Sequence, residues 1–476
     1  MSRAGDLANR YHSEYDFLIW DDGTQYHGDA LGPGTDKGES DFGRLFNDLV
    51  SQIPSGTPGR ISIKRSPRGP YIYNTTPVID RNYITVEGAQ WGVQLQPGAN
   101  VTGLTIRAPA GDSLLAPRIR RLGFIDPNNF TTPLPYILLD NQTNGGGIGW
   151  GLFDELLYFG NNQGSGKTGK FIQINADSAS HATFDCVFNR IFGGSNFMAG
   201  LNGNHFLNGT DSILDIPNGA VFDCIFQDWF VAWHAYTGTN PWVNNSAAGA
   251  QATGNLWYNI KLLADTTPSN VVCFLLNNQP NQYLEDLFLE IGTKPASGSV
   301  GLQISGAGDE IRIRRFRCAF TNTGVQWTAN ATSITRQYFW GLDIFGCDIS
   351  LQSISGDASR KTFISGLLAS TTNLSPNPLT GASFYKTYQG SSGGVAVQGF
   401  NVTTPAYPAS TVAVTNTTGY DCMVYLSGGT FTAAVQVDGV STGLPAATTN
   451  IGVLVPAGST ITLTFSAAGT WKWYAI

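Results

Sequence analysis

Residues 153–157 read Phe-Asp-Glu-Leu-Leu, residues 184–188 read Phe-Asp-Cys-Val-Phe, and residues 222–226 read Phe-Asp-Cys-Ile-Phe. The same phrase, a large apolar residue followed by mixed polar and apolar residues, recurs through residues 118–368 at steps of 24 to 38 residues. One such strand cannot bury its apolar side alone. If the copies stack about 4.8 Å apart, each strand pairs with its neighbours and the inward side chains form continuous columns. The repeat therefore predicts an all-β solenoid, a parallel β-helix.

The register of this solenoid is expected to follow the first apolar residue of each phrase. Those residues are Ile119, Phe153, Phe184, Phe222, Trp257, Leu284, Ile313, Trp340 and Ile364. The segments between the phrases are rich in Gly, Asn, Ser and Thr, which favour turns over helices. The alternative is a large β-sandwich, but its hairpins would space the strands about 8–12 residues apart.

Composition restricts the partners of this 476-residue chain. Charged residues make up 13%, against about 25% in an average soluble domain, and the net charge is −7. Nucleic acid is therefore not expected as a partner. No apolar run approaches the length of a membrane span, and the first residues lack the apolar core of a signal peptide, so membrane insertion is not expected. These features fit a virion component released by lysis, located on the virion or an extracellular surface, and equally a chain trimmed of its signal.

The N-terminal part is expected to close one end of the solenoid. Residues 14–31 alternate well enough for a hairpin that turns at Asp22-Gly23. Ser40 is the expected N-cap of an amphipathic helix, because the apolar residues that follow have helical spacing up to Ile53. A helix at this place would cover the apolar core and the unpaired strand edges of the first coil.

The segments that follow the helix resemble a known superfamily. Gly59-Arg-Ile-Ser-Ile, Tyr71-Ile-Tyr-Asn and Ile84-Thr-Val-Glu-Gly are similar to the opening of pectin-lyase-like right-handed β-helix proteins, which include viral tailspikes. The likeness covers about 60 residues directly and, by the rhythm of the repeats, about 330. It implies a right-handed parallel β-helix. Members include lyases, hydrolases, adhesins and receptor-binding spikes, so the resemblance indicates the fold more than the chemistry.

The pattern of apolar and turn-forming residues changes near residue 400. Short alternating strands separated by Gly, Pro and Asn predict a small antiparallel β-sandwich that caps the second end and holds three chains together. The expected division is residues 1–38 as an attachment segment, residues 39–400 as the capping helix plus β-helix, and residues 401–476 as the sandwich.

Candidate catalytic residues come from the repeated phrases. Asp154, Asp185 and Asp223 follow the leading aromatic residue of three successive phrases, and Glu285 holds the same place two phrases later. An outward ladder would place neighbours about 5 Å apart and alternate members about 10 Å apart, which brackets the carboxylate separations of glycosidases. Stacked carboxylates also suit Ca²⁺, and the alternative is a row of solvated surface residues. His181 is a candidate general base or, alternatively, a loop histidine.

Candidate binding residues are tryptophans placed in or beside the loops, whose flat faces suit the C–H surfaces of sugars. They are Trp229, Trp233 and Trp242, with Trp150 and Trp327 as further members, and Glu285 is a candidate binding residue beside them. A chain with eleven tryptophans also buries several of them. The six cysteines show no metal-ligand spacing, and no metal site is assigned.

These features together predict a viral tailspike or fibre, a homotrimer that binds a host-surface polysaccharide or glycoprotein through many weak contacts. Its N-terminus would attach to other virion proteins. One alternative is an enzyme, a polysaccharide lyase or glycoside hydrolase that uses the aspartates with His181. Another is a structural surface-layer or filament subunit or adhesin, which would show open-ended contacts between chains.

Overall fold

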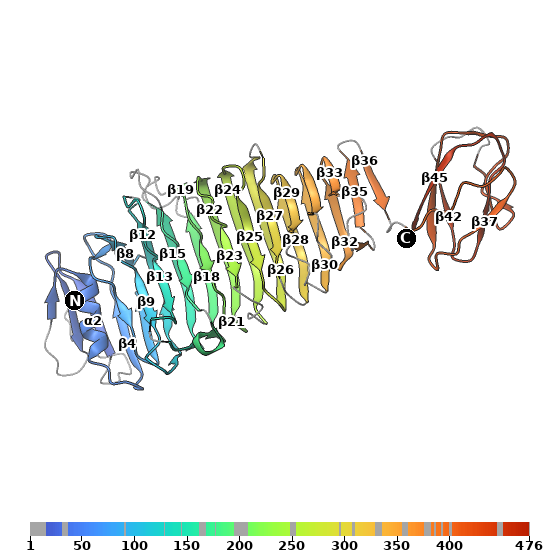
Figure 1. Cartoon of the computed structure of the whole chain (residues 1–476). Coiled ribbons are helices and arrows are strands. Elements are labelled where there is room, and N and C mark those ends of the chain that lie inside the picture. Colours follow the sequence, from blue (N-terminus) through green and yellow to red (C-terminus); the bar gives the residue numbers. More distant parts are fainter. Residues whose placement is uncertain are drawn as a thin grey trace.

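The computed structural model describes most of the chain. The described residues are 16–30, 37–89, 92–127, 129–143, 145–160, 168–176, 178–194, 208–247, 254–294, 297–306, 310–328, 336–354, 360–375, 382–384, 387–391, 394–398, 402–444 and 451–475. Strands dominate, and successive coils stack along one axis (Figure 1).

Parallel strands form the first side of the coils. In order along the axis they are β1 (Asp16–Asp21), β4 (Gly59–Ile63), β7 (Ile84–Gly88), β11 (Arg118–Arg120), β15 (Leu152–Gly160), β18 (Val187–Gly194), β22 (Ile225–Tyr236), β24 (Leu256–Thr266), β26 (Gln282–Thr293), β28 (Ile311–Ala319), β30 (Gln337–Phe345) and β32 (Lys361–Ala369).

The long strands bend in the middle and so also form the second side. From β15 to β30 each bend is one residue with positive φ, such as Glu155 at 55° and Asp228 at 57°, which Asp, Asn and Gly adopt more readily than bulky residues do. At the N-terminal end this side begins with β5 (Tyr71–Tyr73), β8 (Gln94–Pro97) and β12 (Gly123–Asp126). At the other end β34 (Ala382–Phe384) pairs with the first half of β32 and so extends the first side. The second side is continued by β35 (Thr387–Ser391) and β36 (Gly394–Gln398).

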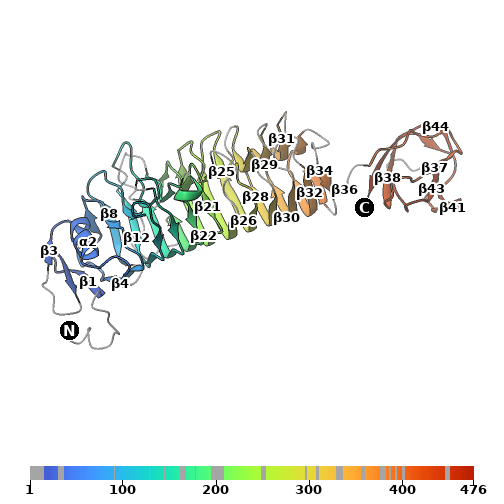
Figure 2. The same cartoon turned by 60° about the horizontal axis from the view of Figure 1, so that its bottom comes forward.

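The third side is an eleven-stranded parallel sheet. Its strands are β6 (Val78–Ile79), β9 (Leu104–Arg107), β13 (Ile137–Asp140), β16 (Ile172–Ile174), β20 (Leu214–Ile216), β23 (Val243–Ser246), β25 (Val272–Asn277), β27 (Val300–Ser305), β29 (Thr323–Trp327), β31 (Ile349–Ser353) and β33 (Thr372–Ser375). Since consecutive strands alternate between sheets and then return beside their earlier neighbours, the chain winds as a coil. The predicted parallel β-helix is confirmed (Figure 2).

Shorter elements lie at the corners of the coils. A four-stranded parallel sheet is formed by β10 (Leu114–Leu115), β14 (Ile148–Gly149), β17 (Thr183–Phe184) and β21 (Val221–Phe222). The 3₁₀ helix η1 (Ala179–His181) precedes β17, and β19 (Asn208–Gly209) pairs with β22.

An aromatic column fills the core behind the first side. Phe153, Phe188, Phe226 and Trp257 stack with ring centroids 4.6, 5.0 and 4.0 Å apart and planes within 9° of parallel. The expected register is wrong at two phrases, because Phe184 and Phe222 do not join this column. They pair with each other and with Gly149 in the corner sheet. The expected register is also wrong by one residue in two later phrases, because the column continues through Phe339 and Phe363 and not through Trp340 and Ile364.

The N-terminal end has the predicted hairpin and capping helix. β1 pairs antiparallel with β2 (Tyr26–Ala30), which pairs with β3 (Lys37–Glu39), and Gly23 has the positive φ of 98° at the turn. Helix α2 (Phe42–Ser51) follows and buries its apolar face on the core (Figure 1). Its N-cap is Asp41 and not Ser40, because the Asp41 carboxylate accepts the backbone N–H groups of Gly43 and Asn74.

The C-terminal strands form antiparallel sheets with a hydrophobic core of their own. They are β37 (Ala413–Thr415), β38 (Cys422–Ser427), β39 (Thr430–Phe431), β40 (Gln436–Val437), β41 (Val440–Ser441), β42 (Ile451–Val455), β43 (Thr460–Thr462), β44 (Phe465–Ala467) and β45 (Thr470–Ala475). They lie beyond the last coil in both views (Figures 1 and 2). The domain boundaries expected from the sequence stay a prediction. Among the described residues, no helix has the length and apolarity needed to cross a bilayer.

Candidate functional site

Outward side chains of β24, β26, β28 and β30 form a surface that we call the aromatic patch. Two adjacent columns build it, because every second residue of the paired strands points outward before the bend. One column consists of Leu256, Tyr283, Arg312 and Tyr338, and the other of Tyr258, Glu285, Arg314 and Trp340. The tyrosines and Trp340 are half-buried, so their rings are supported by neighbours while part of each ring faces solvent.

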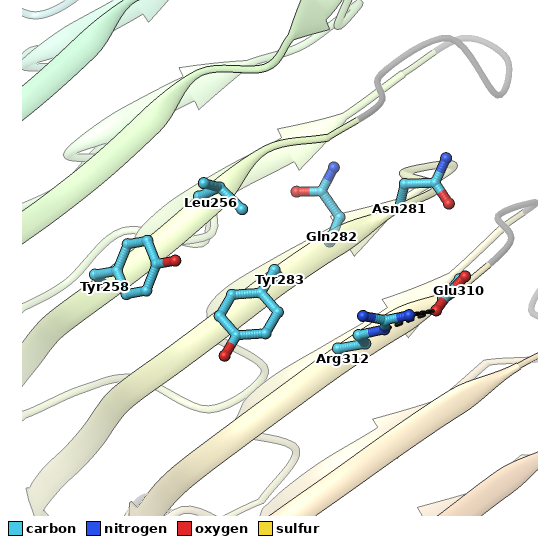
Figure 3. A pocket seen from close by; sticks show the side chains of 7 residues that line it. All are labelled: Leu256, Tyr258, Asn281, Gln282, Tyr283, Glu310 and Arg312. Carbon is cyan, nitrogen blue, oxygen red and sulfur yellow. Dashed lines mark hydrogen bonds and ion pairs between the residues drawn. The ribbon is translucent and has the colours of Figure 1, made fainter.

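The rings of the aromatic patch contact one another. Tyr258 and Tyr283 have centroids 5.8 Å apart, and Tyr338 stacks on Trp340 at 5.6 Å with an interplanar angle of 23°. Part of the patch is hollowed into an open depression of about 350 Å³. Its lining is Leu256, Tyr258, Asn281, Gln282, Tyr283, Glu310 and Arg312 (Figure 3). Figure 3 shows Tyr258 and Tyr283 on neighbouring strands and the ion pair of Arg312 with Glu310 beside them.

Charged groups hold Tyr283 in place. The Tyr283 hydroxyl donates to Glu285 at 2.8 Å and accepts from Arg314 at 3.2 Å. This hydrogen bond with Tyr283, together with the nearby Glu285 carboxylate, raises the pKa of Arg314. Burial, followed by the proximity of Tyr283, raises the pKa of Tyr258. Tyr258 therefore stays neutral at physiological pH, and the patch offers aromatic faces together with hydrogen-bond donors and acceptors.

Asp154 lies away from the other two aspartates. It is 3% exposed, and in its column the neighbours are Arg120 and Asn189. Arg190 forms a two-pronged ion pair with its carboxylate at 2.7 and 2.8 Å, and Asn189 donates to it at 2.8 Å. The expected ladder of three outward carboxylates is therefore wrong for Asp154, whose charge is neutralised inside a structural network.

Asp185 and Asp223 do lie on successive coils. Both are exposed and have positive φ, at 51° and 52°, and the N–H of Asp185 donates to the carbonyl of Phe222. They belong to a line of corner residues that we call the corner column, made of Trp150, Asp185, Asp223, Gly254, Asn281 and Glu310. His181 lies in η1 and is half-buried. His181 precedes Asp185 by four residues in the chain, so the two Cα atoms are at most about 14 Å apart.

The expected exposure of three tryptophans is wrong. Trp229, Trp233 and Trp242 are at most 2% exposed and belong to the core, where the Trp229 indole donates to the carbonyl of Phe188. Trp327 is also buried, whereas Trp150 is 55% exposed. Trp229 and Trp233 lie inside because the bend at Asp228 in the 12-residue strand β22 turns them inward, whereas Trp242 directly precedes β23.

Glu285, also a candidate from the sequence, lies in the aromatic patch beside Tyr283. The patch tyrosines and Trp340 were missed, although a signal existed. Each stands directly beside an inward residue of a repeated phrase, as in Trp257-Tyr258 and Tyr338-Phe339-Trp340, and neighbours of an inward residue point outward.

Within the described residues, no three side chains of the metal-ligating types gather. All six cysteines, also described, are buried free thiols.

The molecule is thus a parallel β-helix protein with an aromatic and charged surface on the side of its coils. No protein-family model matches the sequence, and no curated protein is significantly similar to it. The fold is similar to solved structures that share about a tenth of its sequence.

One of these structures is the protein ORF18 of Geobacillus virus E2, with 10% identity over 91% of this chain and 73% of that chain and a TM-score of 0.41. A second is a mutant tailspike protein of Escherichia coli bacteriophage HK620 in complex with pentasaccharide, with 9% identity over 91% and 88% and a TM-score of 0.33. A third is WceF of Pantoea stewartii, described as a glycan biofilm modifying enzyme with a bacteriophage tailspike-like parallel β-helix fold, with 10% identity over 87% and 56% and a TM-score of 0.25.

Proposed function

We propose that the chain is a tailspike-type virion protein that binds a host-surface polysaccharide on the side of its β-helix. The observation that carries this proposal is the aromatic patch, where Tyr258, Tyr283, Tyr338 and Trp340 present supported rings on three of four successive coils. Aromatic faces stack on the C–H faces of sugar rings, and the Glu285 and Arg314 side chains between them can bond sugar hydroxyls.

The geometry suits a polymer. Coils repeat about every 4.8 Å, so the patch extends for about 14 Å along the axis. The rings belong to strands that are paired on both sides, which keeps the surface pre-organised and reduces the entropy lost on binding.

The experiment is to measure binding of the full-length chain to a panel of purified cell-surface polysaccharides, including bacterial capsules and O-antigens, by biolayer interferometry. We expect binding to at least one of them and a loss of about tenfold in affinity for Tyr283→Ala. Tyr420→Ala is the matched control, because that tyrosine is exposed in the C-terminal part. The proposal fails if no polysaccharide binds, or if Tyr283→Ala binds as tightly as the wild type.

Assembly is a further part of the proposal. We propose a homotrimer that joins other virion proteins through its N-terminal segment, which would place it on the virion. Three copies of a weak site bind a repetitive surface far more tightly than one copy does. Sedimentation should give a mass three times that of the chain, whereas open-ended assembly would favour the filament alternative.

Polysaccharide cleavage is the second candidate, favoured by the exposed pair Asp185 and Asp223 on neighbouring coils. The strand spacing of about 4.8 Å is close to the carboxylate separation of retaining glycosidases, about 5–5.5 Å. Incubation with the bound polysaccharide should then release new reducing ends, and Asp223→Asn should abolish them. Intact polysaccharide after prolonged incubation leaves recognition as the function.

A further inference from the structure

Trp150 is the most exposed large apolar side chain among the described residues of the β-helix, at 55%. Its φ is 54°, in the left-handed region that is unfavourable for a residue with a large side chain. Exposure of an indole and this backbone conformation both lower stability. Strained residues gather at functional sites, because the surrounding structure must hold them there.

The indole of Trp150 is also held in one orientation. Its Nε1–H donates to Asp185 Oδ2 at 3.2 Å, and its ring meets Phe184 edge to face at 6.4 Å. A large exposed ring that is anchored at both its polar and its apolar edge loses little conformational freedom when a ligand stacks on it. This is the arrangement that a stacking platform requires.

The groups beside the platform are acceptors of hydrogen bonds. Asp185 and Asp223 are exposed on the next two coils of the corner column. Carboxylates accept hydrogen bonds from hydroxyl or amino groups and repel anions. A sugar unit that stacks on Trp150 should therefore be rich in hydroxyls and carry no negative charge.

The corner column leads from Trp150 to the aromatic patch. Gly254 follows Asp223 in the corner column. A Cβ at Gly254 would meet the Asp223 carboxylate at 1.9 Å, so this position has no side chain that projects from the column. Asn281 and Glu310, the next members, line the depression of the patch. The pairing from Leu152 through Val187, Ile225 and Leu256 to Tyr283 makes four coil steps, which is about 19 Å at about 4.8 Å per step.

We propose that Trp150, with Asp185 and Asp223, is a second sugar-contact site for the polysaccharide that the aromatic patch binds. This inference rests on the proposed function. One glycan chain lies along the corner column and contacts both sites. Each sugar unit adds about one coil spacing to the length of an extended glycan chain, so about five units are needed to contact both sites. The ligand is therefore a long polymer with a non-acidic unit at its Trp150 end.

The experiment uses size-fractionated fragments of whichever panel polysaccharide binds. The short fragments have about two sugar units and the long fragments about six, because the coil spacing implies that about five units span both sites. Affinities are measured for the full-length wild type, Trp150→Gly and Tyr283→Ala. Glycine suits the positive φ at position 150, so this variant removes the ring without adding strain. Its unfolding midpoint is measured to verify that it folds.

We expect Trp150→Gly to weaken binding of the long fragments by about tenfold and to leave the short fragments unchanged. Tyr283→Ala should weaken both. Equal affinities of Trp150→Gly and wild type for the long fragments would overturn the second site while leaving the proposed function intact. If the wild type binds no fragment, the proposed function itself fails.

Trp150→Phe and Asp185→Asn test the platform and its anchor. Trp150→Phe should keep part of the binding to long fragments, since an aromatic face remains. Asp185→Asn still accepts the indole N–H but removes the negative charge. Because the charged carboxylate is the stronger acceptor for sugar hydroxyls, we expect Asp185→Asn to weaken binding of the long fragments. A large gain in affinity would show that the bound unit is acidic and contradict the proposed ligand class.

Discussion

Phe188 lies directly beside Phe153 in the core, on the next coil, with ring centroids 4.6 Å apart and ring planes inclined by 7°. Phe188→Ala should therefore open a cavity between Phe153 and Phe226 and lower the free energy of unfolding by about 3–5 kcal/mol. Urea unfolding followed by tryptophan fluorescence measures this loss. Phe192→Ala, on the same strand but half-buried and outward, is the matched control and should lose clearly less. Equal losses would contradict the role of the stacked column.

The second prediction concerns Arg190, which pairs with the buried carboxylate of Asp154. Arg190→Met keeps much of the aliphatic stem but leaves Asp154 with the hydrogen bond from Asn189 and the ion pair with Arg120, whose Nε is 3.5 Å away. Loss of one partner of a buried pair should reduce stability by about 3 kcal/mol. The double variant with Asp154→Asn should regain at least about half of that loss, since no buried charge is then unpaired. Chemical denaturation of both variants tests this, and a double variant less stable than Arg190→Met would refute it.

The third prediction concerns the capping helix. A Cβ at Gly43 would lie 1.8 Å from the carbonyl oxygen of Thr75, so Gly43→Ala must push α2 away from the first coil. We expect a loss of more than about 2 kcal/mol and a greater tendency to aggregate, because the covered core and strand edges become accessible. Arg44→Ala, at the neighbouring exposed position, should leave stability within about 0.5 kcal/mol. Thermal unfolding and light scattering give both readouts.

The fourth prediction concerns acid stability. Asp348 accepts hydrogen bonds from Lys294 and from Asn322, and these lower the pKa of its carboxyl group. A carboxyl group with a lowered pKa in the folded state stabilises the fold above its ordinary pKa, and this contribution disappears as the pH falls through the folded-state pKa. The wild type should therefore exceed Asp348→Asn in stability at about pH 6, and the difference should shrink towards about pH 2. Because the pair is largely exposed, the difference is expected to be small. A pH-independent difference in urea midpoints would contradict the assignment.

Sequence patterns predicted the β-helix and its cap because both are visible as periodic apolar residues. They failed at the bends. The phrase from Phe184 to Phe188 has phenylalanine at both ends, and Asp185 between them adopts a φ of 51° that places the two rings on different sides of the coil. An aspartate with positive φ has no periodic signature.

The change of side-chain alternation at a bend is also the reason why the burial of the tryptophans in β22 was not predicted. In β22 the side chain of Phe226 points inward, and the bend at Asp228 shifts the alternation so that Trp229, Val231 and Trp233 are buried as well. Strict alternation from Phe226 would have placed Trp229 outside. The aromatic patch was missed for a related reason, since outward positions become recognisable only when the register is known.

The pairing of each coil with only its two neighbours has an evolutionary consequence. Residues such as Tyr258 and Tyr338 alternate with the buried ones, so they can be exchanged without altering a core contact. Recognition can then diverge one coil at a time on an unchanged scaffold, and a lineage facing a new surface polymer could adapt through a few outward substitutions.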